Sequence, residues 1–217
     1  DRDMTVWDRT NGRIYRISWK ETYKPVKVDL GKMSGNEFLG FEKHASDWHW
    51  RMSRKLLQEQ VAENKFNSGA PTIWYDAITN LAYDDKDTTL KLMWYCHCIP
   101  EFGPVLADNM KRHENDIVRS WAIQLATEEA GKSKLNSETL LDLARNDPSP
   151  TVRLALASAL PNLDAKTVWE VASALAMHGE DKDDRFLPKM IWFGLARVIA
   201  QDWSRGLALA AKTPLPS

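Results

Sequence analysis

The stretch DIVRSWAIQLA, residues 116–126, returns in similar form as PTVRLALASAL at residues 150–160. The two copies lie 34 residues apart, and Arg119 of the first aligns with Arg153 of the second. Both copies place apolar residues at the three- and four-residue spacings that make one face of a helix. A repeat of this length predicts stacked helical units, each of which buries its apolar face against its neighbours.

Weaker copies of the same pattern occur on both sides of this pair. Arg51 precedes Arg119 by 68 residues, which is twice the same offset, and Lys91 stands at the Arg position of another copy. A later copy keeps the apolar pattern without the Arg. The three copies are DWHWRMSRKLL (47–57), DTTLKLMWYC (87–96) and DRFLPKMIWFGLA (184–196).

Each copy has a residue that can cap a helix three positions before one apolar residue of the aligned pattern, which is Trp50, Leu90, Val118, Val152 or Leu187. Such short side chains accept hydrogen bonds from the free N–H groups of the first turn. The spacings between these caps are 40, 28, 34 and 35 residues, and this irregular period favours a helix-pair stack of the HEAT or armadillo kind. In each unit the Val would enter the core, while the Arg reaches along the stack toward an acidic residue in a turn. The predicted caps are Asp47, Asp87, Asn115, Ser149 and Asp184.

We therefore predict an all-α fold, a right-handed α-α superhelix of HEAT-like repeats, with a short β segment at the N-terminus. The β segment is GRIYRISW, which follows a Thr-Asn-Gly turn signal and is rich in β-branched and aromatic residues. The predicted divisions are an extended or β segment over 1–30, a linker over 31–45, and a repeat domain of about five helix pairs over 46–217. Predicted helices after the first cover roughly 73–82, 88–99, 104–112, 116–129, 137–145, 150–160, 165–177, 184–200 and 203–211.

The composition narrows the classes of partner. The 217 residues include 29 Lys and Arg against 30 Asp and Glu, for a formal net charge of −1. This balance counts against nucleic acid as a partner, because phosphate-binding domains usually carry a basic excess. The sequence contains no apolar run of the length that crosses a bilayer, so no membrane span is predicted.

The sequence Cys96-His97-Cys98 combines residue types that bind zinc. On a helix, however, the two cysteines point about 200° apart, so they could not hold one ion together. We expect one cysteine to pack in the core and the other to lie at a helix contact. No catalytic or metal-binding residue is predicted, since the sequence lacks H-E-x-x-H, G-x-S-x-G and phosphate-binding glycine motifs.

The ten tryptophans raise the question of an aromatic binding surface. Most of them fall on apolar helical faces, where a large aromatic side chain belongs in the core. Trp48 and Trp74 are the exceptions, and His49 lies beside the first of them. We therefore name Trp48, His49 and Trp74 as the candidate binding residues.

Two stretches together resemble one family of proteins. WDRTNGRIYRISW, residues 7–19, is similar to the closing propeller strand of large exported proteins of the membrane-bound dehydrogenase and planctomycete-type haem-binding family. ASDWHWRMSRKLLQEQ, residues 45–60, is similar to the first HEAT helix that follows this propeller. In that family a c-type cytochrome domain comes after the HEAT repeats.

This resemblance implies a HEAT module taken from between two other domains, with residues 1–30 as the remnant of a β-propeller. It implies a periplasmic or otherwise exported location and a parent protein similar to sugar or alcohol dehydrogenases. The haem attachment signature C-x-x-C-H is absent from this sequence. We therefore expect no cofactor in this chain, and c-type haem only in the parent protein.

The expected function is that of a non-catalytic scaffold or protein-interaction module. Its partners would be the adjacent propeller and cytochrome domains, or a docking protein. Two alternatives remain open. The chain could belong to a redox enzyme whose active site lies in other domains, or it could be a HEAT-like DNA-binding or DNA-repair protein, which the near-zero net charge disfavours.

Overall fold

The structure is a computed structural model that describes residues 15, 17, 19, 28–33, 35–41, 46–66, 76, 86–99 and 103–216. Within these ranges the fold is all-α and contains no strand. Short 3-10 helices form η2 (Leu30–Lys32), η3 (Gly35–Phe38), η7 (Leu160–Asn162) and η8 (Gly179–Asp181). The α-helices are α1 (Asp47–Ala62), α3 (Lys86–His97), α4 (Gly103–Met110), α5 (Asp116–Thr127), α6 (Ser137–Asn146), α7 (Pro150–Ala159), α8 (Ala165–Leu175), α9 (Leu187–Ile199) and α10 (Trp203–Ala210).

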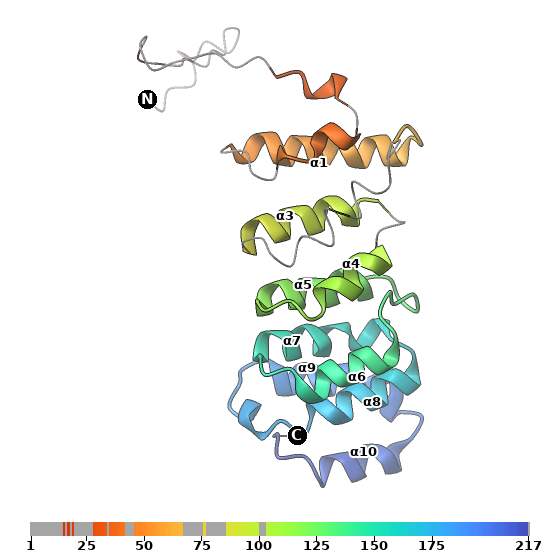
Figure 1. Cartoon of the computed structure of the whole chain (residues 1–217). Coiled ribbons are helices and arrows are strands. Elements are labelled where there is room, and N and C mark those ends of the chain that lie inside the picture. Colours follow the sequence, from red (N-terminus) through yellow and green to blue (C-terminus); the bar gives the residue numbers. More distant parts are fainter. Residues whose placement is uncertain are drawn as a thin grey trace, which may run out of the picture.

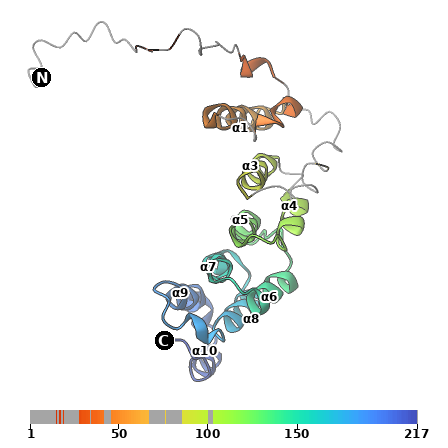
Figure 2. The same ribbon diagram turned by 60° about the vertical axis from the view of Figure 1, so that its left-hand side comes forward.

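The helices form two rows that run along the length of the molecule (Figures 1 and 2). We call α1, α3, α5, α7 and α9 the inner row, since each packs against the next in this order. We call α4, α6, α8 and α10 the outer row. Figure 2 shows that the inner row is curved and that the outer row follows its convex side.

The predicted N-terminal β segment is not supported. Tyr15, Ile17 and Trp19 lie in no strand, and their exposed fractions are 79%, 100% and 69%; the remainder of the segment lies outside the described residues. A strand needs a partner for its backbone groups, and a single short hairpin is only marginally stable in water. Within the predicted linker 31–45, by contrast, Phe38 is fully buried where η3 packs against α1.

Side-chain caps begin several of the helices at the predicted residues. The Asn115 side chain accepts from the backbone N–H of Ile117, and the Ser149 hydroxyl accepts from that of Thr151. The carboxylate of Asp184 accepts from the backbone N–H groups of Phe186, the residue just before α9, and of Leu187, the first residue of α9. The prediction that Asp47 and Asp87 precede their helices is wrong, because both residues lie inside the first helical turn.

The two matching arginines make the same contact, one repeat apart. Arg119 binds both carboxylate oxygens of Asp147 at 2.7 and 2.8 Å, and Arg153 binds both of Asp181 at 2.6 Å. Each acid lies 28 residues after its arginine, in the turn that follows the next outer helix. The prediction that the Arg reaches an acidic residue in a turn is therefore confirmed for this pair. We call these two ion pairs the rungs.

The rungs are also joined to each other through the backbone. A second nitrogen of Arg153 donates to the carbonyl oxygen of Asp147 at 3.1 Å, so Asp147 accepts from both arginines. The corresponding nitrogen of Arg119 donates to the carbonyl of His113, which stands 34 residues before Asp147. The hydrogen bonds that Arg153 donates to Asp181 raise the pKa of Arg153 above its usual value, which keeps this buried side chain charged.

Among the described residues, no third rung of this kind precedes Arg119. Lys91, which the alignment put at the Arg position, faces α1 instead: its ammonium lies 3.9 Å from the carboxylate of Asp47 and 5.7 Å from the ring of Trp50. His113 replaces the acid in the turn before α5, and only 5% of its surface is exposed. A lysine cannot replace the two-pronged contact that an arginine makes with a carboxylate.

The core consists of two apolar clusters that both draw on α4 and α5. One runs from α5 to α10 and the other from η3 to α5, so consecutive residues such as Ala122 and Ile123 belong to different clusters. At Gly194 of α9 an added Cβ atom would lie 2.6 Å from the Leu160 side chain, so the helix comes close to Leu160 only because this residue is glycine. None of the described helices has the length and apolar character of a membrane-spanning segment.

Replacing Asp181 by alanine should lower the free energy of unfolding by about 3–5 kcal/mol, because it removes both oxygens that bond the buried Arg153 and leaves only the exposed Glu180, 3.6 Å away, to face its charge. Urea unfolding measures this loss. The double replacement R153L/D181L should cost less than D181A alone, since it removes both charges.

The matched control is Arg51→Ala, which breaks an exposed pair with Asp47, in which 68% and 66% of the two side chains are exposed. Exposed pairs of this kind are worth about 0–1 kcal/mol. Equal losses for D181A and R51A would contradict a special role for the buried rung.

A second prediction concerns the cap of α8, where Asp164 accepts from the hydroxyl and backbone N–H of Thr167 and from the N–H of Lys166. These bonds, that of the Thr167 hydroxyl above all, lower the pKa of Asp164. A carboxyl group whose pKa is lower in the folded chain than in the unfolded chain stabilises the fold at any pH above its unfolded pKa of about 3.9. This stabilisation is lost as the pH falls through the folded pKa. An asparagine at this position caps equally well but does not titrate. The melting temperature of wild type relative to D164N should therefore fall between pH 6 and pH 3; a pH-independent difference would refute this assignment.

Candidate functional site

The inner face of the molecule can be identified from burial. Each central helix of the inner row packs against a neighbour on both sides and against the outer row behind it, so its exposed side chains must lie on the remaining face. Gln124 of α5, Ser158 of α7 and Phe193 of α9 are all exposed. They lie 34 and 35 residues apart, which are the same intervals as between the caps of these helices. These three residues therefore mark equivalent places on the inner face.

An aromatic row crosses the first three helices of the inner row. The rings of Trp50 (α1) and Trp94 (α3) stack at 5.9 Å with 13° between their planes. The rings of Trp94 and Trp121 (α5) meet edge to face at 5.3 Å. Trp94 and Trp121 are half-buried, so the row both holds the three helices together and reaches the surface.

Arg54 lies on this aromatic row. Its guanidinium carbon is 5.1 Å from the ring centroid of Trp50 and 5.8 Å from that of Trp94, close enough for cation–π attraction to both. The side chain is half-buried, and no carboxylate within the described residues forms an ion pair with it. We call Arg54, Trp50, Trp94 and Trp121 the Arg–Trp row.

The structure places two of the three predicted binding residues beside each other. Trp48 is exposed, with 57% of its surface accessible, and its ring meets that of His49 edge to face at 5.1 Å. His49 also stacks on Phe41 at 6.2 Å, so it packs between two aromatic rings. Trp74 lies outside the described residues.

Sequence reasoning missed the Arg–Trp row. Trp50 and Trp94 had been assigned to the core from their apolar helical faces, and Trp50 is indeed buried. Whether Trp94 and Trp121 reach the surface depends on how neighbouring helices stack, which one helix's pattern does not contain. The available signal was the R-x-x-R spacing of Arg51 and Arg54, which places the second arginine on the face of Trp50.

The Cys-His-Cys sequence lies at the end of α3 and its three side chains point to different surroundings. Cys96 is fully buried in the core, as expected for one of the two cysteines. The thiol of Cys98 donates to the Trp94 carbonyl at 3.0 Å, and burial raises its pKa to about 11. His97 lies 3.0 Å from the carboxylate of Glu128; burial lowers the pKa of His97, against the effect of Glu128. Within the described residues, no group of three or more His, Cys, Asp or Glu side chains could hold a metal ion.

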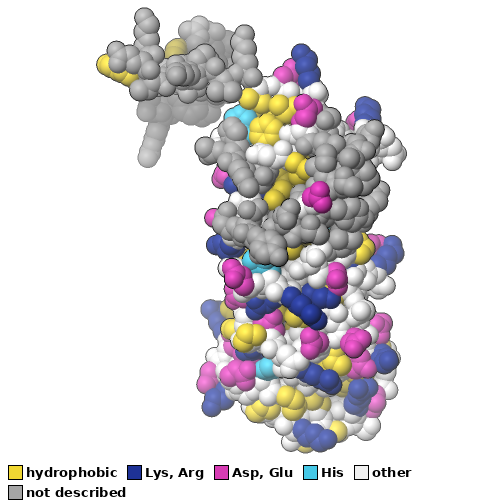
Figure 3. All heavy atoms as spheres, viewed as in Figure 1, with side chains coloured by type: hydrophobic (Ala, Val, Ile, Leu, Met, Phe, Trp, Pro, Cys, Tyr) yellow, Lys and Arg dark blue, Asp and Glu magenta, His cyan; other side chains and the backbone are white. Residues whose placement is uncertain are grey.

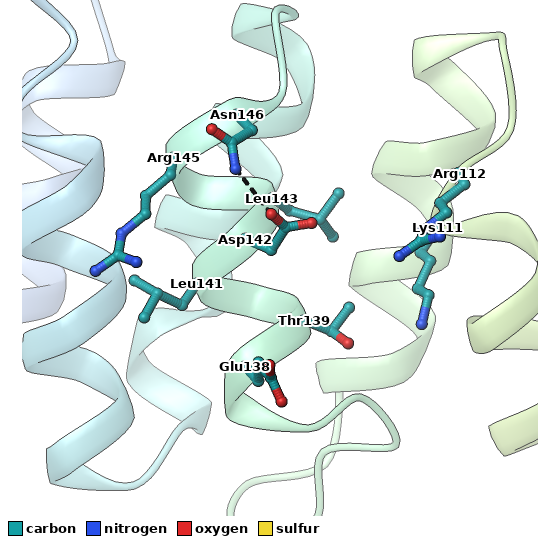
Figure 4. Close-up of a pocket in the computed structure, with 9 residues that line it drawn as sticks. All are labelled: Lys111, Arg112, Glu138, Thr139, Leu141, Asp142, Leu143, Arg145 and Asn146. Carbon is teal, nitrogen blue, oxygen red and sulfur yellow. Dashed lines mark hydrogen bonds between the residues drawn. The ribbon is translucent and has the colours of Figure 1, made fainter.

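A shallow groove of about 410 Å³ lies along α6 of the outer row (Figure 4). Lys111 and Arg112 come from the end of α4, while Leu141 and Arg145 point to the opposite side of α6 from Thr139. Its charges are mixed, and several are already occupied: Lys111 pairs with Asp108, and Asn146 donates to Asp142 at 2.7 Å. The polar side chains of the groove do not converge on one position, so we assign no catalytic or ligand-binding site to it.

Comparison with protein-family models, with curated proteins and with solved structures finds no match for this chain.

The thiol of Cys98 should react slowly despite its partial exposure. With a pKa of about 11, roughly one thousandth of it is thiolate at pH 8, against about a quarter for an ordinary cysteine. Alkylation by iodoacetamide at pH 8, followed by mass spectrometry, should be more than about a hundredfold slower in the native chain than in urea. Equal rates in both conditions would show that the surroundings of Cys98 do not suppress its thiolate.

Proposed function

We propose that this chain is a non-catalytic helical-repeat module of the HEAT type, a right-handed superhelix that binds another protein. The observation that carries the proposal is the recurrence of the Arg–Asp rung at the repeat interval, Arg119 with Asp147 and then Arg153 with Asp181. Two equivalent contacts one repeat apart support a repeating architecture. Such stacks present a long continuous face, and repeat proteins use this kind of face to bind other molecules.

We place the binding surface on the inner face, at the Arg–Trp row. Tryptophan and arginine are the residue types that most often dominate the energy of protein interfaces. Here the guanidinium of Arg54 is held over two indole rings, so less side-chain freedom would be lost when a partner binds it. A carboxylate of the partner is the group that fits a preoriented guanidinium.

The charge distribution supports a protein partner over nucleic acid. Over the outer row, positive and negative side chains are interspersed on the face seen in Figure 3. A protein that grips DNA needs a basic stripe, and a net charge of −1 gives the chain no basic excess for one, which favours a different partner. If the family resemblance holds, the partners are the neighbouring propeller and c-type cytochrome domains of an exported, dehydrogenase-like parent, which would also hold the haem and any redox chemistry.

Site-specific photo-crosslinking tests the inner face. A photoreactive amino acid replaces Gln124 on the inner face, and in a matched control it replaces Lys166, whose side chain is 83% exposed at the start of α8. Both variants are irradiated in extract of the cells that express the chain. We expect one discrete protein adduct from position 124 and none from position 166.

The identified partner then allows a quantitative test. Arg54→Met keeps the aliphatic packing on the tryptophans but removes the charge, and should weaken binding at least tenfold, as at an interface hot spot. Arg51→Met, one turn away and exposed, should change binding less than about twofold. Isothermal titration calorimetry measures both, and melting temperatures verify that the variants fold.

Several results would contradict the proposal. Adducts of the same proteins at positions 124 and 166, or equal affinities of R54M and R51M, would place binding elsewhere. A DNA mobility shift at low salt would favour the nucleic-acid alternative. A haem absorption band in the purified chain would show that redox chemistry resides within these residues.

A further inference from the structure

A second surface lies on α9, far along the molecule from the Arg–Trp row. It is an open pocket of about 500 Å³ with a mainly apolar lining. Phe193, one of the residues that mark the inner face, borders it with 71% of its surface exposed. The pocket is lined by Asp184, Pro188, Lys189, Trp192, Phe193 and Pro216.

One wall of this pocket is a proline-rich segment of the same chain. After α10, the sequence Thr213-Pro214-Leu215-Pro216 folds back onto α8, η8 and α9. The Thr213 hydroxyl donates to the carbonyl of Ala176 and accepts from the N–H of Leu215, whose side chain is buried in the core. Pro214 packs against Gly179.

The contact between this segment and α9 has a specific form. The indole N–H of Trp192 donates to the carbonyl oxygen of Pro216 at 3.1 Å. A proline residue has no backbone N–H, but its carbonyl oxygen still accepts a hydrogen bond. A tryptophan can donate to that carbonyl with its indole N–H and at the same time pack its ring against the proline ring. Proteins that bind proline-rich peptides use aromatic-lined grooves in this way, because such peptides are already extended and lose little entropy on binding.

The pocket continues this contact along α9. Beyond Pro216, the side chains of Trp192, Phe193 and Pro188 offer further ring and aliphatic surface, and this part of the pocket stays open as far as the described residues go. Trp192 and Phe193 are adjacent on the helix, and Pro188 lies one turn before Trp192. An extended segment that lies against the chain's own Pro-Leu-Pro would therefore place a proline ring between Phe193 and the wall formed by Pro216.

We propose that the α9 pocket binds a proline-rich segment of a partner protein in the extended polyproline II conformation. The occupant follows from the segment already seated there, since the free pocket is continuous with the Trp192–Pro216 contact. This site shares no residue with the Arg–Trp row, so the failure of either proposal leaves the other standing.

Fluorescence anisotropy with a labelled peptide tests the pocket. The probe is fluorescein-labelled Ala-Pro-Leu-Pro-Pro-Leu-Pro-Ala, and its control replaces every proline by alanine. We expect saturable binding of the proline peptide to the full chain and at least tenfold weaker binding of the control. Phe193→Ala should weaken binding of the proline peptide at least tenfold.

The matched variant is Leu207→Ala on α10, which removes a side chain of nearly equal exposure, 69%, that does not line the pocket. It should bind the proline peptide as wild type does. Because Phe193 and Leu207 are both largely exposed, both variants should keep the wild-type melting temperature, which verifies the fold.

Four outcomes would overturn the proposal. The first is no saturable binding up to about 1 mM peptide, the affinity of a marginal complex. The second is equal binding of the alanine peptide, which would indicate non-specific apolar contact. The third is unchanged affinity of F193A. The fourth is concentration-dependent self-association in sedimentation that F193A abolishes, which would make a second copy of the chain the occupant.

Discussion

A buried arginine is tolerated only where its charge is paired and hydrogen-bonded, and this requirement governs the second half of the structure. Arg153 makes two bonds to Asp181 and one to the carbonyl of Asp147, with the carboxylate of Glu180 3.6 Å away, and its side chain is 3% exposed. The arginine sits on an inner helix, while the acid sits in the turn that follows the next outer helix. The ion pair thus fixes how far one helix pair lies from the next, a distance that apolar packing alone leaves adjustable.

Where the rungs stop, another interaction replaces them. Between α1 and α5 the inner helices are joined by the ring contacts of Trp50, Trp94 and Trp121, the first pair stacked and the second edge to face, and the guanidinium of Arg54 from α1 lies over the first two rings. Aromatic contacts tolerate a wider range of geometries than a two-pronged ion pair does. The two apolar clusters, which divide at α4 and α5, coincide with this change from ionic to aromatic connection. The molecule therefore joins its inner helices by two different physical means.

The sequence predicted those features that depend on neighbours along the chain. The helical periodicity, the caps at Asn115 and Ser149, and the reach of Arg153 toward an acid in a turn were all readable from local spacing. The α9 helix was predicted from residue 184 but begins at Leu187, because Asp184 bonds to N–H groups from outside the helix. The 34-residue repeat indicated the rung, but contacts between distant segments that the repeat does not relate were not predictable: the indole of Trp192 meets a carbonyl 24 residues away, and the surface of Trp94 depends on its contact with α1, a separate helix. The candidate site was predicted only in part, since Trp48 is exposed as expected while Arg54 escaped notice.

The rung has a consequence for how such a chain can change its length. Residues 116–149 contain both Arg119 and Asp147, and residues 150–183 contain both Arg153 and Asp181. A tandem duplication of one such segment would bring its own complete ion pair, and the carbonyl that the following arginine needs would come with it. Gene duplication therefore lengthens the molecule in whole units without any compensating substitution elsewhere, while an insertion of another size between an arginine and its acid would disturb that ion pair.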